Sequence, residues 1–284
     1  MKWTRGTRND NVIDVRGRKS RAPVVAGGSI AVAIVALLVS RLLGIDVTGL
    51  LGGGGGGGAS TTQQGSAEPP TGPDPDAELV DFIKFAMADI QATFDAMYKA
   101  EGKQYRLAKL YIFTDSVDTA CGRSSSAIGP FYCPGDSNAY IDLSFYRDLR
   151  ARFGAPGDFA QVYVLAHEVG HHLQNLIRAE GNEPRPAQGQ SKNEYSVRME
   201  LQADCFAGIW AKSAQGKKLL EVGDLEEAIT AATAIGDDRL QKQAGVEVNP
   251  ETFTHGTSAQ RVAWFRRGFD NGRFASCDTF AGQL

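Results

Sequence analysis

Residues 164–173 read VLAHEVGHHL and contain the pattern H-E-x-x-H within a run whose apolar residues recur at helical spacing. His167 and His171 stand about one helical turn apart, so their imidazoles share one face and can bind the same zinc ion. Glu168 lies beside that position, where its carboxylate can accept a proton from metal-bound water. The pattern predicts a Zn²⁺ site with one ion per chain. The alternative is a pair of surface histidines on a solvated helix.

A catalytic zinc ion takes a third protein ligand and keeps one position open. The metzincin pattern would require a glycine at position 174 and a histidine at position 177, but the chain has Gln174 and Ile177. Residues 181–186, GNEPRP, end the first helix and let the next one run back against it. On that next helix Glu200 completes a His, His, Glu site. Asp204, one turn later, accepts the second ring N–H of a zinc-bound histidine; the alternative is a solvated helix face.

The fourth histidine stands near the start of a later helix. His255 comes just before Thr257 and Ser258, either of which can act as the N-cap, and Arg261 follows within two turns. A histidine and an arginine near the metal can stabilise the oxyanion of a tetrahedral intermediate, so we expect His255 and Arg261 in the catalytic site. The alternative is a capping or core histidine with a surface arginine.

The rest of the chain supports a folded body around these residues. Its 284 residues are 42% hydrophobic and 22% charged, which excludes wholesale disorder and leaves room for one large or two modest domains. Few strands and many helices predict an α+β fold. We expect strands at 105–113 and 139–143, a helix that starts after Asp76, and helices at about 158–179, 192–214, 224–242 and 258–273.

The N-terminal quarter differs sharply from this body. Residues 1–22 hold seven basic and two acidic side chains, a net charge of +5, whereas the whole chain carries −3, with no basic excess that would indicate nucleic acid as a partner. Residues 23–45 are almost entirely apolar and predict one uncleaved membrane-spanning helix. Residues 46–75 are a flexible Gly/Pro-rich linker. The positive-inside rule keeps the basic head in the cytoplasm and exports the catalytic domain, residues 76–284.

The cysteines agree with an oxidising compartment. Cys121, Cys133, Cys205 and Cys277 are even in number and all follow the predicted span. The pairing of Cys121 with Cys133 is the most local one, and we predict it as a disulfide, whereas the pairing of the other two stays open. The alternative is four reduced cysteines that pack as small apolar residues.

These features together resemble a bacterial family of predicted neutral zinc metallopeptidases with a single N-terminal anchor and an exported H-E-x-x-H domain. The likeness rests on MKWTRGTRNDNVIDVRG at 1–17, IDVTGLL at 45–51, CGRSSSAIGPFYCPGDSNAYIDLSFY at 121–146, AHEVGHHLQ at 166–174, ELQADCFAG at 200–208 and FTHGTSAQRVAWFRRGF at 253–269. At motif level the chain is similar to gluzincin endopeptidases, which implies a zincin-like domain with Glu200 as a zinc ligand. It also looks like the membrane zinc endopeptidases with a T-H-P…R segment, although Gly256 stands in place of their proline. The resemblance further implies that a strand at about 138–143 is the sheet edge that pairs with the substrate backbone.

The sequence therefore predicts a single-pass protein of the bacterial inner (plasma) membrane whose periplasmic or extracellular domain is a zinc-dependent endopeptidase acting on peptides or proteins. One alternative is a membrane-tethered protein with a structural zinc ion that binds envelope partners without catalysis. A second alternative is a zinc hydrolase of small amides or cell-wall peptides. Glu168 favours catalysis because a purely structural site does not need it.

Overall fold

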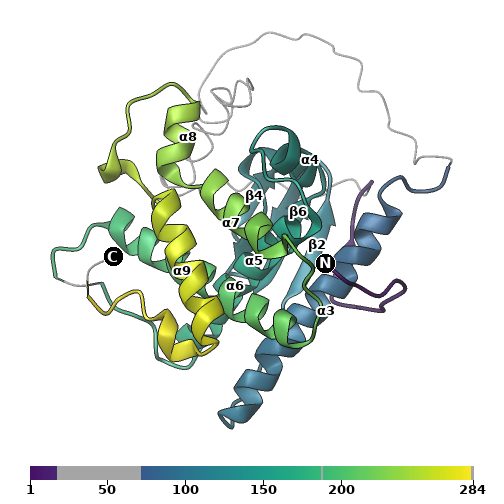
Figure 1. The fold of residues 1–284 in the computed structure, drawn as a ribbon, viewed down its shortest axis with the longest axis horizontal. Coiled ribbons are helices and arrows are strands. Elements are labelled where there is room, and N and C mark those ends of the chain that lie inside the picture. The colour runs from purple at the N-terminus through teal and green to yellow at the C-terminus, as the bar shows by residue number, and fades with distance from the viewer. Residues whose placement is uncertain (18–71, 187, 283–284) are drawn as a thin grey trace.

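The computed structural model describes residues 1–17, 72–186 and 188–282 (Figure 1). Its helices are α3 (Ala77–Ala100), α4 (Ser144–Ala151), α5 (Asp158–Ala179), α6 (Lys192–Gly216), α7 (Asp224–Ala234), α8 (Asp237–Gln243) and α9 (Ser258–Asn271). Its strands are β1 (Val12–Asp14), β2 (Lys109–Phe113), β3 (Ser116–Thr119), β4 (Gly122–Ser125), β5 (Phe131–Cys133) and β6 (Asn138–Asp142). The fold thus combines many helices with a small sheet, as the sequence predicted.

The main sheet has the strand order β1-β2-β6-β5. β1, β2 and β6 are parallel, and β5 runs antiparallel to β6 after the turn at residues 134–136. β6 is therefore an inner strand, and the expectation that residues 138–143 form the substrate-binding edge is wrong. The reason is the turn, which folds the preceding strand back onto β6. β5 is the strand at this edge of the sheet in the described residues.

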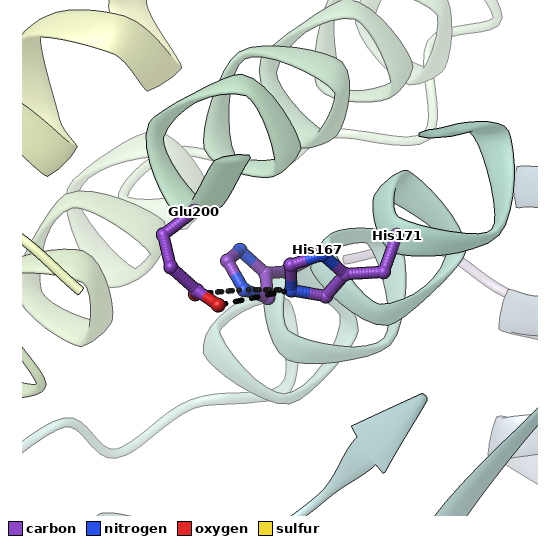
Figure 2. A group of neighbouring side chains, drawn as sticks. All are labelled: His167, His171 and Glu200. Atoms are coloured by element: carbon purple, nitrogen blue, oxygen red, sulfur yellow. Dashed lines mark hydrogen bonds and ion pairs between the residues drawn. The ribbon is translucent and has the colours of Figure 1, made fainter. Parts of the chain in front are cut away.

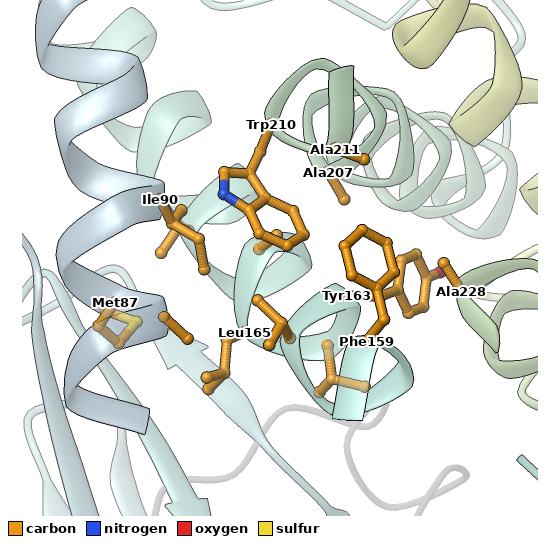
Figure 3. Packing of buried hydrophobic residues seen from close by; sticks show 14 of the residues in the cluster. Met87, Ile90, Phe159, Tyr163, Leu165, Ala207, Trp210, Ala211 and Ala228 are labelled. Carbon is orange, nitrogen blue, oxygen red and sulfur yellow. The ribbon is translucent and has the colours of Figure 1, made fainter. Parts of the chain in front are cut away.

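The helical core is built around α5. Trp210 of α6 stacks on Phe159 of α5 with ring centroids 5.2 Å apart, and both side chains are fully buried (Figure 3). The indole N–H of Trp210 donates to Asp89 on α3, at 2.9 Å, which satisfies its one polar atom inside the core. Ala207, Ala211 and other small residues of α6 let the aromatic rings of α5 approach closely. The core therefore holds the zinc-motif helix on several sides.

Two glycines set the distances between the helices of the site. At Gly170 on α5, an added Cβ would lie 2.9 Å from Cα of Ala203 on α6. At Gly268 on α9, an added Cβ would lie 1.9 Å from the carbonyl oxygen of Cys205 on α6. Only a residue without Cβ permits such close contact between backbones. At these two points α5 and α9 therefore each lie close to the backbone of α6.

Two disulfides fasten the loops to this core. Cys121 and Cys133 are joined, as predicted. The second bond joins Cys205 of α6 to Cys277, which lies beyond α9, and this pairing was open at the sequence level. All four cysteines are paired, so the alternative of reduced cysteines does not hold in this structure.

Two of the expected elements differ from the prediction. The helix expected at 224–242 is broken into α7 and α8 at Gly236, where an added Cβ would lie 2.4 Å from the backbone nitrogen of Ser258. The strand expected from residue 105 starts at Lys109, because Ala108 donates its N–H to the side chain of Gln91 rather than to a strand. Tertiary contacts override the local pattern in both cases.

The N-terminal residues are not a separate head. Residues 1–17 pack against α3, and β1 pairs with β2, so this segment belongs to the same body as the zinc-motif helix (Figure 1). The boundary expected at residue 22 lies outside the described residues. Within the described ranges no helix has the length and apolar character needed to cross a bilayer. The apolar stretch at 23–45 and most of the linker lie outside the described residues.

The close crossing of α6 and α9 generates a stability prediction. Gly268→Ala places a methyl group against the backbone at Cys205, so the two helices must separate, and we expect a loss of about 1–3 kcal/mol of unfolding free energy. Gly216→Ala is the matched control, because it lies at the end of α6 with no atom within 4 Å of the added Cβ. Alanine there should leave stability unchanged or raise it slightly. Urea unfolding of the full-length protein measures both, and equal midpoints for the two variants would contradict the packing argument.

Candidate active site

Three predicted ligands converge where α5 and α6 touch (Figure 2). Nε2 of His167 lies 3.2 Å from Nε2 of His171 and 3.1 Å from Oε2 of Glu200. Nε2 of His171 lies 3.4 Å from Oε1 of Glu200. Zinc bonds of about 2.0–2.1 Å in tetrahedral geometry put neighbouring ligand atoms about 3.3 Å apart. The three groups therefore fit one zinc ion, and Gly170 makes the fit feasible by letting the two helices approach.

Each histidine is oriented through its other nitrogen. Nδ1 of His167 lies 2.8 Å from Oδ1 of Asp204, and Nδ1 of His171 lies 2.9 Å from Oε1 of Gln174. Donation from Nδ1–H in both rings leaves the Nε2 lone pairs directed at the metal position. Asp204 was predicted for this role. Gln174 was missed, although its position three residues after His171 on one helix face could have indicated it.

Gln174 is itself held in place by α6. Its amide nitrogen donates to the carbonyl oxygen of Met199 at 2.6 Å and to the side chain of Gln202 at 3.2 Å. The amide oxygen is thereby turned toward His171. The orientation of the second zinc ligand thus depends on contacts between the two helices, as does that of the first.

A buried network surrounds Asp204, whose side chain is fully buried. Arg261 of α9 donates to both carboxylate oxygens, each at 2.9 Å, and Tyr163 of α5 donates its hydroxyl to Oδ1 at 2.5 Å. The oxyanion role of Arg261 stays a prediction; the structure shows a guanidinium that is 2% exposed, lines the cavity and donates to both oxygens of Asp204. Its place in the structure is behind His167, where it neutralises the carboxylate that orients that ring.

The charges of the site favour a bound cation. Burial alone would lower the pKa of His167, but Asp204 and Glu200 beside it raise that pKa to about 10. Burial alone would raise the pKa of Glu200, yet the charges of His171 and His255 hold it well below its ordinary value. The ligand cluster is thus anionic enough to attract a positive charge, which a divalent metal ion supplies after displacing the proton.

The three ligands open onto a cavity of about 520 Å³. Glu168 lines it next to the ligands, and burial raises the pKa of its carboxyl group. A cavity of this size at a three-ligand metal site can admit a peptide segment, and a raised pKa makes the Glu168 carboxylate a better proton acceptor. The rest of the wall includes the loop before β5, the first two residues of β5, two further phenylalanines and His255; these are Ile128, Gly129, Pro130, Phe131, Tyr132, Phe145, Phe153 and His255.

His255 faces this cavity from the turn before α9. Its Nδ1 lies 3.2 Å from Oδ1 of Asp237, and its side chain is 29% exposed. In the part of the chain that the structure describes, no hydrogen bond engages its Nε2. Burial alone would lower the pKa of His255, but Glu200 and Asp237 raise it. These carboxylates favour the protonated imidazole, which can direct Nε2–H toward a negative charge in the cavity.

Asp237 holds the turn that carries His255. Its Oδ2 accepts the backbone N–H groups of Thr254, His255 and Gly256 at 2.7, 2.6 and 3.0 Å. Gly256 has a φ of +87°, which proline cannot adopt, so this turn differs from one built on T-H-P. The sequence did not indicate Asp237, since it lies on α8, far in sequence from the turn that it holds.

His172 has a structural role. Its Nε2 donates to the carbonyl oxygen of Arg106 at 2.5 Å, and its Nδ1 accepts from the hydroxyl of Tyr132 at 3.0 Å. Burial lowers its pKa, which agrees with a neutral ring. This histidine attaches the zinc-motif helix to the edge strand β5 and takes no part in the metal site.

Comparison with known proteins agrees with this geometry. Residues 1–280 match the family described as "putative neutral zinc metallopeptidase". The chain is 46% identical to the uncharacterized protein YpfJ of Escherichia coli K12 over all of both chains. It is 38% identical to the uncharacterized protein Rv2575 of Mycobacterium tuberculosis H37Rv over 85% of each chain. No solved structure matches it. The chain belongs to this zinc metallopeptidase family.

The ligand geometry predicts the metal content of variants. The full-length protein should bind about one zinc ion per chain, and His171→Ala or Glu200→Ala should lose it, because two donors no longer hold the ion tightly. Gln174→Ala should keep the site but weaken zinc affinity about 10–100-fold by releasing His171. His255→Ala is the control, since it removes a cavity histidine that is not a ligand. Metal analysis after dialysis tests all four, and an unchanged zinc content in His171→Ala would refute the site.

Proposed function

We propose that the protein is a membrane-anchored, zinc-dependent endopeptidase with a zincin-like catalytic domain at residues 76–284. One observation carries the proposal: the His167, His171 and Glu200 donors meet at zinc-ligand separations beside Glu168 on an open cavity. Family membership supports the reaction type. The substrate class is peptides or proteins.

The chain's own groups account for the proton transfers of peptide hydrolysis. When bound, the zinc ion supplies a Lewis acid that lowers the pKa of a water molecule and polarises the scissile carbonyl. Glu168 accepts the proton of the attacking water and passes it to the leaving amine. Burial raises the pKa of its carboxyl group, which makes the carboxylate a better proton acceptor than one in water.

His255 stabilises the charge that forms on the substrate. Its Nε2–H faces the cavity while Asp237 holds Nδ1, so the donor is oriented before the reaction begins. Arg261 acts through Asp204 and His167 as a positioning residue. This division differs from the sequence-based expectation, in which both residues contacted the oxyanion.

In the non-catalytic alternative, the protein binds the zinc ion but catalyses no reaction. A structural zinc site is normally closed by four protein ligands, whereas this cluster has three and opens on a cavity. The presence of Glu168 at the cavity wall also favours catalysis. The cavity is also large enough for small amides and cell-wall peptides, the substrates of the second alternative. Substrate profiling with folded proteins and short peptides distinguishes that hydrolase from an endopeptidase.

For the location we propose the bacterial inner membrane with the catalytic domain on the oxidising, exported side. The apolar stretch at 23–45 supports an anchor. The bonds Cys121–Cys133 and Cys205–Cys277 support the exported side, because such disulfides persist in oxidising compartments.

Glu168→Gln tests the chemistry directly. The amide keeps the shape of the side chain but cannot accept a proton, so we expect kcat/KM to fall on the order of 10²–10⁴-fold with zinc content unchanged. A casein or labelled-peptide assay on the full-length protein in detergent measures the activity. Equal activity of Glu168→Gln and the wild type would rule out the proposed role and favour a binding protein.

A second test concerns the oxyanion donor and its support. His255→Ala should retain zinc and lower kcat/KM about a hundredfold, since the lost bond forms only in the transition state. Asp237→Asn removes a negative charge that raises the pKa of His255, so the alkaline limb of the pH profile of kcat/KM should move to lower pH. An Asp237→Asn profile that superimposes on that of the wild type would show that protonated His255 is not the donor.

A further inference from the structure

We infer that residues 1–17, hereafter the head, dock on the zinc-binding body in the full-length protein, so that the head and the zinc site lie on the same side of the membrane. The inference does not depend on peptidase activity. It rests on backbone pairing, apolar burial and ion pairs between the head and the body, and it replaces the cytoplasmic placement expected from the positive charge of residues 1–22.

Backbone hydrogen bonds make the head a strand of the main sheet. β1 pairs with β2 in parallel, with Val12, Ile13 and Asp14 opposite Leu110, Tyr111 and Ile112. Leu110 donates its N–H to the carbonyl oxygen of Asn11 at 2.8 Å, and Val15 donates to that of Ile112 at 2.9 Å. Removing the head would expose this edge of β2, an inner strand of the sheet whose Leu110 and Ile112 side chains are fully buried.

Apolar side chains of the head enter the core of the body. Met1 is 6% exposed and Val12 is 8% exposed. Trp3 packs edge-on against Phe82 of α3, with ring centroids 5.4 Å apart. Burial of one large apolar side chain contributes about 1.5–3 kcal/mol. These residues would face water if the head and the body were apart.

The head also neutralises a group of carboxylates at the start of the zinc-motif helix. The α-amino group of Met1 donates to both oxygens of Asp158, at 2.6 and 2.7 Å, and lies 3.4 Å from Asp224 and from Glu221. Asp158 is the first residue of α5, and Asp224 is the first residue of α7. Without this cation, like charges would oppose each other where the two helices meet.

The basic side chains of the head have partners on the body. Arg16 forms ion pairs with Asp74 and Asp76 just before α3, and Arg5 pairs with Glu78 in its first turn. Pairing with acidic residues of the body accounts for part of the positive charge of the head. That part of the charge therefore does not require a cytoplasmic location. Exposed ion pairs of this kind each contribute little to stability. They matter here because the charges of the head and of the body are complementary.

A membrane cannot run between partners in such contact. The hydrocarbon core of a bilayer is about 30 Å thick, whereas the head and the body meet at hydrogen-bond distance. The docked head must therefore share the compartment of α5, which is incompatible with a single bilayer crossing between residues 17 and 72. On this inference the apolar stretch at 23–45 attaches the chain to the membrane but is not a single span. The two disulfides of the body favour the oxidising side for both.

A cysteine cross-link in the full-length protein tests the docking. Parallel partners such as Ile13 and Tyr111 have Cα atoms about 4.8 Å apart, within the range of a disulfide, so Ile13→Cys with Tyr111→Cys should form a bond on mild oxidation of isolated membranes. The matched control is Ile13→Cys with Lys109→Cys, two residues along the same strand, where the Cα separation of about 8 Å exceeds disulfide reach. Peptide mapping by mass spectrometry should find the first bond and not the second.

Labelling in cells supplies an independent readout. Arg8→Cys on the head and Val222→Cys on the body are exposed, and a membrane-impermeant thiol reagent should reach both from the same side. Absence of the Ile13–Tyr111 cross-link, or labelling of the two probes from opposite sides, would overturn the inference. Neither readout requires enzymatic activity, so a failure here is distinguishable from a failure of the proposed peptidase function.

Discussion

The carboxylate of Asp204 is the group on which the site depends. A fully buried, unpaired charge would be strongly destabilising, and Asp204 is tolerated because α5 and α9 both bring donors to it. Burial alone would raise its pKa, but the charges of Arg261 and His167 lower it, so the group stays ionised. The contacts that satisfy this charge also fix the ring of His167. The same contacts therefore hold the helical core together and orient the first zinc ligand.

Small residues make that arrangement sterically possible. Gly170 lets α5 approach α6, and Gly208 and Gly268 let α6 and α9 cross, with an added Cβ at Gly208 only 2.0 Å from the carbonyl oxygen of Phe265. With larger residues the helix axes would move apart, and the side chains of His167 and Glu200 would no longer meet at 3.1 Å. The glycine between the two motif histidines is thus as much a part of the metal site as the ligands.

Sequence reasoning succeeded where the information is local and failed where it depends on packing. The spacing of His167 and His171 within one helix, and the motif that follows on α6, predicted three groups that the structure brings within reach of one metal ion. Gln174 and Asp237 were not predicted, because their roles depend on hydrogen bonds that form only in the folded chain and follow no sequence pattern. The edge strand was misplaced for a related reason, because a turn decides which strand lies outside. The positive charge of residues 1–22 was assigned to membrane topology, whereas the structure also gives Arg16 acidic partners just before α3.

The parallel pairing of β1 with β2 has a consequence for the order of folding. Val12 finds Leu110 only after a long intervening chain has been made, and closing so large a loop costs conformational entropy before any contact repays it. Residues 12–14 are thus synthesised well before the strand with which they pair. Until the two strands pair, the edge of β2 is an open template for another strand, and the nascent protein is most prone to aggregate during that interval.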